Sequence, residues 1–183
     1  MNLLPIFLKL AGRRVLLVGG GPVAASKLDA LLRAGADVLV VAPAVQPSIA
    51  ASGVRIERRP YQDGDLDGVW LAVAAATPDV NARVARDAET RQVFVNAVDD
   101  PGNASAYLGA VVRRAGVTLA ISTSGEAPAL AGILRETADA ILPPDLERWS
   151  ACASELRARW KRDAVPMTER RPQLVAALKA LYP

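Results

Sequence analysis

Residues 15–24 read VLLVGGGPVA, and they are the most informative part of the chain. The first four form a continuous apolar run, which is typical of a parallel strand buried on both faces. Three glycines follow, and the pattern G-x-G-x-x-A ends at Ala24, inside a predicted helix. A strand, a glycine turn and a helix in this order predict a binding site for the pyrophosphate of a dinucleotide.

Each position of this glycine turn has a physical role in such a site. Gly19 permits the tight turn, Gly21 lets the backbone approach the pyrophosphate, and Ala24 allows close packing of the helix on the strand. The free N–H groups at the helix N-terminus favour phosphate. The predicted cofactor contacts are therefore Gly19, Gly20, Gly21, Pro22 and Val23. The alternative is a tight turn that binds nothing.

The expected contact to the adenosine ribose is missing. Dinucleotide sites usually carry an acid about 20 residues further on, at the end of the second strand. Here residues 40–43 read VVAP, and no arginine stands there to favour NADP. We therefore expect backbone groups near Pro43 and Ala44 to contact the ribose.

Outward from the glycine turn, strand and helix patterns alternate up to about residue 100. The predicted strands are residues 15–18, 37–41, 54–57, 69–75 and 93–98, and the clearest helices are residues 22–34 and 80–90. Leu28, Leu31 and Leu32 are expected on the buried face of the first helix, with Ala24. Strands separated by helices predict an α/β protein with a Rossmann-type, doubly wound parallel sheet.

The pattern changes after Pro101. Residues 106–112 and 117–121 predict two strands joined as a hairpin, and helices are expected at residues 128–142, 146–162 and 172–181. These segments are too short to bury a hydrophobic core of their own, so we expect them to pack on the sheet domain or on a second subunit.

Composition excludes several classes of function. Aromatic residues make up 4% of the chain and the net charge is +3. Single-stranded nucleic-acid binders need aromatic platforms, and DNA-binding domains need a concentrated basic surface, so we expect no nucleic-acid partner. No run reaches the roughly 18 apolar residues that a membrane span needs.

The chain has one cysteine, Cys152, and no histidine. A lone cysteine forms no internal disulfide, which favours a cytoplasmic protein. The absence of histidine excludes a Ser-His-Asp triad, a histidine base and a histidine-based metal site, so no metal ligands are predicted.

Six segments resemble the precorrin-2 dehydrogenase family, the N-terminal module of siroheme synthases. They are LPIFLKL at 4–10, VGGGPVA at 18–24, AAAT at 74–77, NAVDDP at 96–101, STSGEAPAL at 122–130 and LRE at 134–136. Two positions depart from the family: Ser26 stands where relatives have arginine, and Thr123 where they often have serine.

The resemblance implies a fold and a chemistry. Such proteins are homodimers that use NAD to oxidise the tetrapyrrole precorrin-2 to sirohydrochlorin, and some also insert ferrous iron. The implied organisation is an NAD-binding Rossmann domain at residues 1–112, a dimerisation segment at 113–145 and a helical C-terminal segment at 146–183. Ala76 and Thr77 are implied cofactor contacts. With no histidine and one cysteine, no iron site made by protein ligands is evident, and iron insertion is left open.

Asp99 is the candidate catalytic residue. It follows the fifth strand, at the sheet edge where ligands of open α/β folds bind, and it matches the family's catalytic aspartate. A carboxylate there could accept a proton as hydride leaves for the nicotinamide. The alternative is that residues 99–101, Asp-Asp-Pro, are only a turn.

The candidate substrate contacts are Ser122, Thr123, Ser124 and Gly125. They precede a predicted helix, and hydroxyls with free N–H groups at a helix N-terminus suit a tetrapyrrole carboxylate. A simple N-cap is the alternative.

Two other functions compete with this one. A non-catalytic NAD-sensing module would share the glycine turn but would need neither Asp99 nor the segment 122–130. An ordinary small-substrate dehydrogenase usually has a histidine or a Tyr–Lys pair. Histidine is absent, and no lysine lies four residues after Tyr61, Tyr107 or Tyr182.

Overall fold

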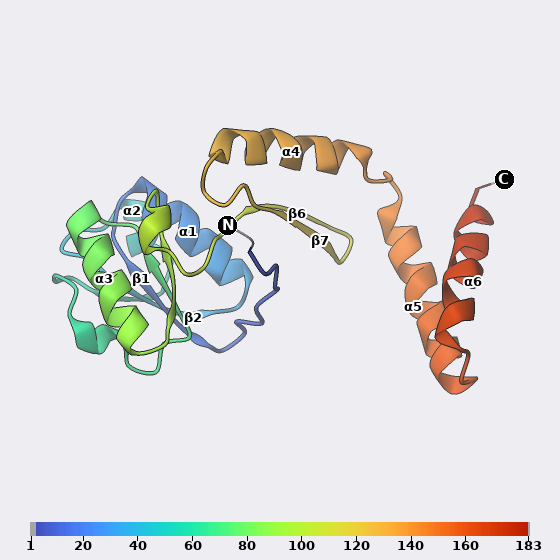
Figure 1. Ribbon diagram of the computed structural model, residues 1–183, viewed down its shortest axis with the longest axis horizontal. Coiled ribbons are helices and arrows are strands. Elements are labelled where there is room, and N and C mark those ends of the chain that lie inside the picture. Colours follow the sequence, from blue (N-terminus) through green and yellow to red (C-terminus); the bar gives the residue numbers. More distant parts are fainter. Residues whose placement is uncertain (1–2, 183) are drawn as a thin grey trace. The chain divides into compact units, whose positions relative to one another are not determined.

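The computed structural model describes residues 3–182, which divide into two compact units (Figure 1). The first unit extends to Leu108 and also includes Ser124–Ala127. The second comprises Gly109–Thr123 and the residues from Pro128 onward. The predicted domain boundary after residue 112 lies inside a strand of the second unit, and the assignment of a dimerisation segment stays a prediction.

The first unit is built on a parallel sheet with the strand order β3-β2-β1-β4-β5. Its strands are β1 (Arg14–Val18), β2 (Asp37–Val41), β3 (Arg55–Glu57), β4 (Leu71–Ala74) and β5 (Phe94–Ala97). This is the order expected of a Rossmann fold, in which the direction of winding reverses between β1 and β4. The predicted doubly wound parallel sheet is confirmed.

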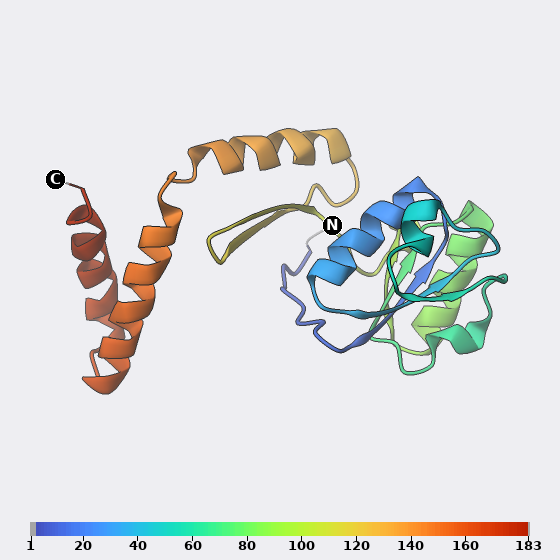
Figure 2. The same ribbon diagram turned by 180° about the vertical axis from the view of Figure 1, so that it is seen from behind.

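Helices cover both faces of this sheet. Helix α3 (Pro78–Thr90) lies in front in Figure 1, whereas α1 (Pro22–Arg33) lies in front in Figure 2, where the short helix α2 (Pro47–Ala50) is also seen. Leu16 and Val18 of β1 join the core under α3, and Val15 and Leu17 join the core under α1. The continuous apolar run of β1 therefore reflects burial on both faces.

One predicted core residue is more exposed than expected. Ala24, Leu28 and Leu31 are buried on the inner face of α1, but Leu32 is 39% exposed. At 3.6 residues per turn, Leu32 lies about 80° around the helix from Ala24, at the margin of the apolar stripe. The prediction for Leu32 was wrong because the buried stripe is narrower than assumed.

Two short 3-10 helices complete the first unit. η1 (Asp63–Leu66) precedes β4, and η2 (Pro101–Asn103) follows β5. Neither of them, nor α2, was predicted from the sequence.

The second unit contains a hairpin and three helices. Strands β6 (Ala110–Arg114) and β7 (Val117–Ile121) pair antiparallel through Ala115 and Gly116, both at positive φ. Helix α4 (Pro128–Ile141) packs on the hairpin, and α5 (Leu146–Arg162) packs beside α6 (Met167–Lys179), as Figure 1 shows. No helix in residues 3–182 combines the length and apolarity that crossing a membrane requires.

Two elements of this unit begin elsewhere than predicted. The first hairpin strand starts at Ala110 and not at residue 106, because the amides of Ser105 and Ala106 bind the carbonyl of Val95 instead. The last helix starts at Met167, so Pro172 lies inside it. The Arg170 guanidinium donates to the Val165 carbonyl at 2.8 and 3.0 Å and thereby fixes the earlier start.

Candidate functional site

Two of the three consecutive glycines are required by close packing. Gly19 has a φ of 129°, and a Cβ there would overlap the carbonyl group of Ala75. A Cβ on Gly20 would overlap the carbonyl of Ala44 and lie 2.9 Å from the Cα of Val45. The turn is thus seated between the chain segments that follow β2 and β4, and the Gln46 amide donates to the Gly20 carbonyl at 2.8 Å.

Gly21 is different because nothing in the described structure comes within 4 Å of a Cβ built there. It is the N-cap of α1, and no side chain caps this helix. Within residues 3–182, the amides of Gly21, Val23 and Ala24 donate no hydrogen bond. Free amides at a helix N-terminus beside open space form the kind of cradle that receives a phosphate, so these residues fit a dinucleotide.

The strands next to β1 contribute the other predicted cofactor residues at the same edge of the sheet. Pro43 and Ala44 follow β2, Ala76 and Thr77 follow β4, and all four are exposed. Because parallel strands end at one edge, these two pairs flank the glycine turn.

Sequence reasoning missed Asn81, which fixes the position of this β4 loop. Its side chain is only 4% exposed, and its Oδ1 accepts a hydrogen bond of 3.0 Å from the Ala76 amide. Thr77 is the N-cap of α3, and its carbonyl accepts from the Asn81 amide. The available signal was a polar residue at helical spacing from Val84 and Ala88, on the buried face of the helix.

Asp99 lies beyond β5, two strands away from the glycine turn. With strands about 4.8 Å apart, the lateral separation is about 10 Å. Its φ is 56°, its side chain is exposed, and its carboxylate has no hydrogen bond or ion pair with any residue that the structure describes.

The turn at this place is stabilised by the neighbouring acid. Asp100 is the N-cap of η2, and its Oδ2 accepts a hydrogen bond of 2.7 Å from Asn103 Nδ2. The carboxylates of the Asp-Asp-Pro sequence therefore differ in surroundings: Asp100 holds the turn, and Asp99 is left free for other chemistry.

The loop that carries Asp99 is closed at its base. Ser105 Oγ accepts from the Val95 amide at 2.9 Å, and Asn96 Nδ2 donates to the Ala106 carbonyl at 2.9 Å. Asn96 is only 7% exposed, and the sequence motif 96–101 contained it without indicating this role. Its signal was a polar residue in an otherwise apolar strand.

The four predicted substrate residues are divided between the units. Ser122 and Thr123 follow β7 in the second unit, while Ser124 and Gly125 belong to the first, with Asp99. Ser124 and Gly125 have φ values of 56° and 81°. A Cβ on Gly125 would lie 3.0 Å from Cγ of Pro101, so this segment packs directly against the Asp99 loop.

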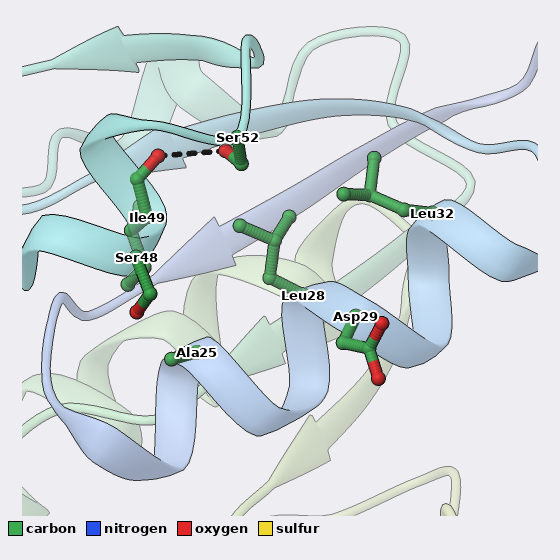
Figure 3. Close-up of a pocket in the computed structure, with 7 residues that line it drawn as sticks. All are labelled: Ala25, Leu28, Asp29, Leu32, Ser48, Ile49 and Ser52. Atoms are coloured by element: carbon green, nitrogen blue, oxygen red, sulfur yellow. Dashed lines mark hydrogen bonds between the residues drawn. The ribbon is translucent and has the colours of Figure 1, made fainter.

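A separate hollow of about 220 Å³ lies between α1 and α2 (Figure 3). Its lining includes Leu28, Leu32 and Ile49, and Ser52 Oγ is used in a hydrogen bond to the Ile49 carbonyl. Asp29 at its rim is paired with Arg33. None of the predicted site residues lines this hollow. Within residues 3–182, no group of three or more acidic, cysteine or histidine side chains is arranged to hold a metal.

The strand order and the free helix terminus define the first unit as a dinucleotide-binding α/β domain. Comparison with known proteins agrees: a family model described as putative NAD(P)-binding matches residues 6–110. The chain belongs to this NAD(P)-binding family.

Known relatives extend the match beyond that domain. Siroheme synthase 1 of Aeromonas salmonicida (strain A449) is 43% identical over 176 residues, and siroheme synthase of Azotobacter vinelandii (strain DJ / ATCC BAA-1303) is 42% identical over the same length. Both alignments cover 93% of this chain but 38% of the relative, so the chain spans about two fifths of the length of these proteins.

A solved structure also matches. SirC, a precorrin-2 dehydrogenase, superposes with a TM-score of 0.74 at 27% identity, covering 95% of this chain and 88% of that one. The resemblance predicted from the sequence motifs is confirmed.

Proposed function

We propose that this chain is an NAD-dependent dehydrogenase that oxidises precorrin-2 to sirohydrochlorin in siroheme biosynthesis. The observation that carries the proposal is the free carboxylate of Asp99 at the same sheet edge as the open cradle of Gly21. The match to a precorrin-2 dehydrogenase over nearly the full length of both chains supports this substrate.

The residues of the chain have distinct tasks in this proposal. Gly21 and the free amides of Val23 and Ala24 bind the pyrophosphate, and the backbone at Pro43 and Ala44 lies where the adenosine ribose is expected. Bound NAD supplies a hydride acceptor. The overall oxidation removes a hydride and a proton from the macrocycle, and Asp99 takes the proton as general base.

The segment 122–125 is proposed to bind substrate carboxylates. Its hydroxyls and backbone amides precede α4, where the partial positive charge of a helix N-terminus favours an anion. Ser124 and Gly125 also lie against the Asp99 loop. A carboxylate bound at Ser124 or Gly125, which belong to the same unit as Asp99, would bring the macrocycle close to Asp99.

We also infer that the chain forms a homodimer and functions in the cytoplasm. Large apolar side chains on α4 are exposed, among them Ile133 at 61% and Ile141 at 76%, and a second copy would bury them. The cytoplasmic location rests on the single cysteine.

Anaerobic incubation of the purified chain with precorrin-2 and NAD tests the proposed function. We expect the sirohydrochlorin absorption spectrum to develop together with the near-ultraviolet absorption of NADH. Bound NAD without turnover would contradict the dehydrogenase and favour the NAD-sensing alternative.

A further inference from the structure

Tyr107 connects the Asp99 loop to the segment that starts at Ser124. Its hydroxyl donates a hydrogen bond of 3.2 Å to the carbonyl of Pro101, two residues after Asp99. Its ring edge also faces Gly125, because a Cβ built on Gly125 would lie 3.4 Å from Tyr107 Cε1. We call Tyr107, Pro101 and Gly125 the Tyr107 latch.

The latch depends on close approach of the backbone at Gly125. This glycine has a φ of 81°, and any side chain would press on the Pro101 ring at 3.0 Å. The missing Cβ thus allows the segment to contact the proline and the tyrosine together. All three residues belong to the first unit.

Tyr107 lies outside the hydrophobic core of the first unit. Tyr107 belongs to neither core cluster and lies between β5 and β6, outside regular structure. In the described part of the chain, the Pro101 carbonyl is the one hydrogen-bond partner found for this hydroxyl. By contrast, the hydroxyl of Tyr61 lies at the core and donates to Asp87.

Other hydrogen bonds hold the Asp99 loop at its base and within its own turn. Ser105 and Asn96 close the base, and Asn103 binds Asp100 within the turn. None of these bonds fixes the loop relative to the segment 124–127. The Tyr107 latch lies between the two, with Pro101 on one side and Gly125 on the other.

We propose that Tyr107 is a positioning residue, which holds the Asp99 carboxylate and the segment 124–127 in fixed register. This inference rests on the proposed function. A base must lie within hydrogen-bond distance of the proton that it removes, and a displacement of about 1 Å can lower a rate by about 100-fold. Tyr107 therefore acts through Asp99 and not as a proton donor of its own.

The first test is the Tyr107→Phe variant, which keeps the ring and removes the hydroxyl. We expect kcat for precorrin-2 oxidation to fall by about 10-fold, within the range that misplacement of a base produces. NAD affinity and the melting temperature should stay unchanged. Tyr61→Phe, which also removes one hydroxyl hydrogen bond from the first unit, should leave kcat unchanged. An unaltered kcat in Tyr107→Phe would overturn the proposal.

A double-mutant cycle separates positioning from direct action. If Tyr107 acts only through the carboxylate, Tyr107→Phe should cause no further loss of kcat in an Asp99→Asn background. Losses that multiply would mean that the phenol acts on the substrate independently, and they would contradict the positioning role.

Hydrogen exchange gives a readout that does not depend on activity. We expect the hydrogen-bonded amides of Asp100, Asn103 and Ala104 to exchange faster in Tyr107→Phe than in the wild type, while those of β1 and β4 stay unchanged. Equal exchange in the two proteins would overturn the latch whatever the activity. A wild type without turnover whose loop is nevertheless loosened by Tyr107→Phe would refute the proposed function and not the latch.

Discussion

The three adjacent glycines of the turn after β1 differ in their surroundings. Gly19 and Gly20 are demanded by the backbone of the neighbouring loops, whereas Gly21 faces open space. The fingerprint pattern predicted the tight turn at Gly19 and the open backbone at Gly21, because both follow from the local strand–turn–helix geometry. The contact of Gly20 with Ala44 was not predictable, since it depends on where a distant loop lies.

Substitution of Gly21 tests the cofactor site. A Cβ here meets no protein atom within 4 Å, so Gly21→Asp should fold normally. A carboxylate about 4 Å from a phosphate costs about 4 kcal/mol at an effective dielectric constant of 20, so we expect NAD affinity to fall by at least about 100-fold. Isothermal titration calorimetry would measure the NAD affinity. Gly21→Asn, which has the size of the aspartate without its charge, should lose less NAD affinity. Unchanged affinity in Gly21→Asp would exclude this cradle as the pyrophosphate site.

The structural role of Asn81, like the contact of Gly20, is seen only in the structure. Asn81→Ala would remove the part-buried hydrogen bond from the Ala76 amide, which costs about 0.5–1.5 kcal/mol of unfolding free energy. Urea denaturation should show this loss, and NAD affinity should fall because the β4 loop is released. Asn103→Ala, which removes a bond in another loop, should leave NAD affinity unchanged. A neutral effect of Asn81→Ala on both measurements would contradict the assigned role.

At the scale of elements, the sequence predicted the strands and helices that have a local pattern of apolar residues. It missed element boundaries that depend on hydrogen bonds to residues far away in the sequence. All five strands of the sheet were expected, because four are short, largely apolar runs between turn residues and β3 lies in a segment of alternating polarity. The start of β6 was misplaced because Val95, a residue of another strand, captures the amides of Ser105 and Ala106. Hydrogen bonds of that kind leave no periodic signal in the sequence.

The element η1 gives a prediction about pH. Asp65 in this element has a 7% exposed side chain and accepts hydrogen bonds from Arg59, at 2.6 and 2.9 Å, and from the Gln62 amide. Burial raises the pKa of Asp65, but the hydrogen bonds from Arg59 and the Gln62 amide outweigh it, so the pKa lies below its ordinary value.

A carboxylate with a lowered pKa stabilises the fold above its unfolded pKa, and this stability is lost as the pH falls through the folded value. Between about pH 5 and pH 3, the unfolding free energy of the wild type should therefore fall more steeply than that of Asp65→Asn. Equal slopes in urea titrations across this range would show that the Arg59 pair contributes nothing to the fold.

At the scale of the whole molecule, the two units differ in how much apolar surface they bury. The first has two clusters of buried side chains on either face of its sheet. Neither cluster includes a residue of the second unit, where Leu130, Ile133 and Ile141 of α4 are exposed. The sequence predicted that the later segments are too short to bury a hydrophobic core of their own. Only the structure shows which apolar side chains of α4 remain exposed.

We expect a dimer in solution for this reason. Light scattering at micromolar concentration should give twice the chain mass of 19.3 kDa. Ile133→Glu should shift the population toward monomer, because a charge would be buried in the interface. Glu136→Gln on the same helix is a matched control that should stay dimeric. A wild type with the mass of one chain would refute the dimer.

The Asp99 carboxylate is proposed to accept a proton during oxidation of precorrin-2, and Asp99→Asn tests this role most directly. Asparagine tolerates the positive φ of this position and keeps the shape of the side chain, but it cannot take the proton. Asp100→Asn serves as the control for the turn.

The measurement is kcat for sirohydrochlorin formation under anaerobic conditions with saturating NAD. Since a general base typically contributes about 100- to 10,000-fold, Asp99→Asn should lose activity of that order at unchanged NAD affinity, and Asp100→Asn should lose much less. Wild-type turnover in Asp99→Asn would mean that the residue only forms a turn, and it would contradict the account.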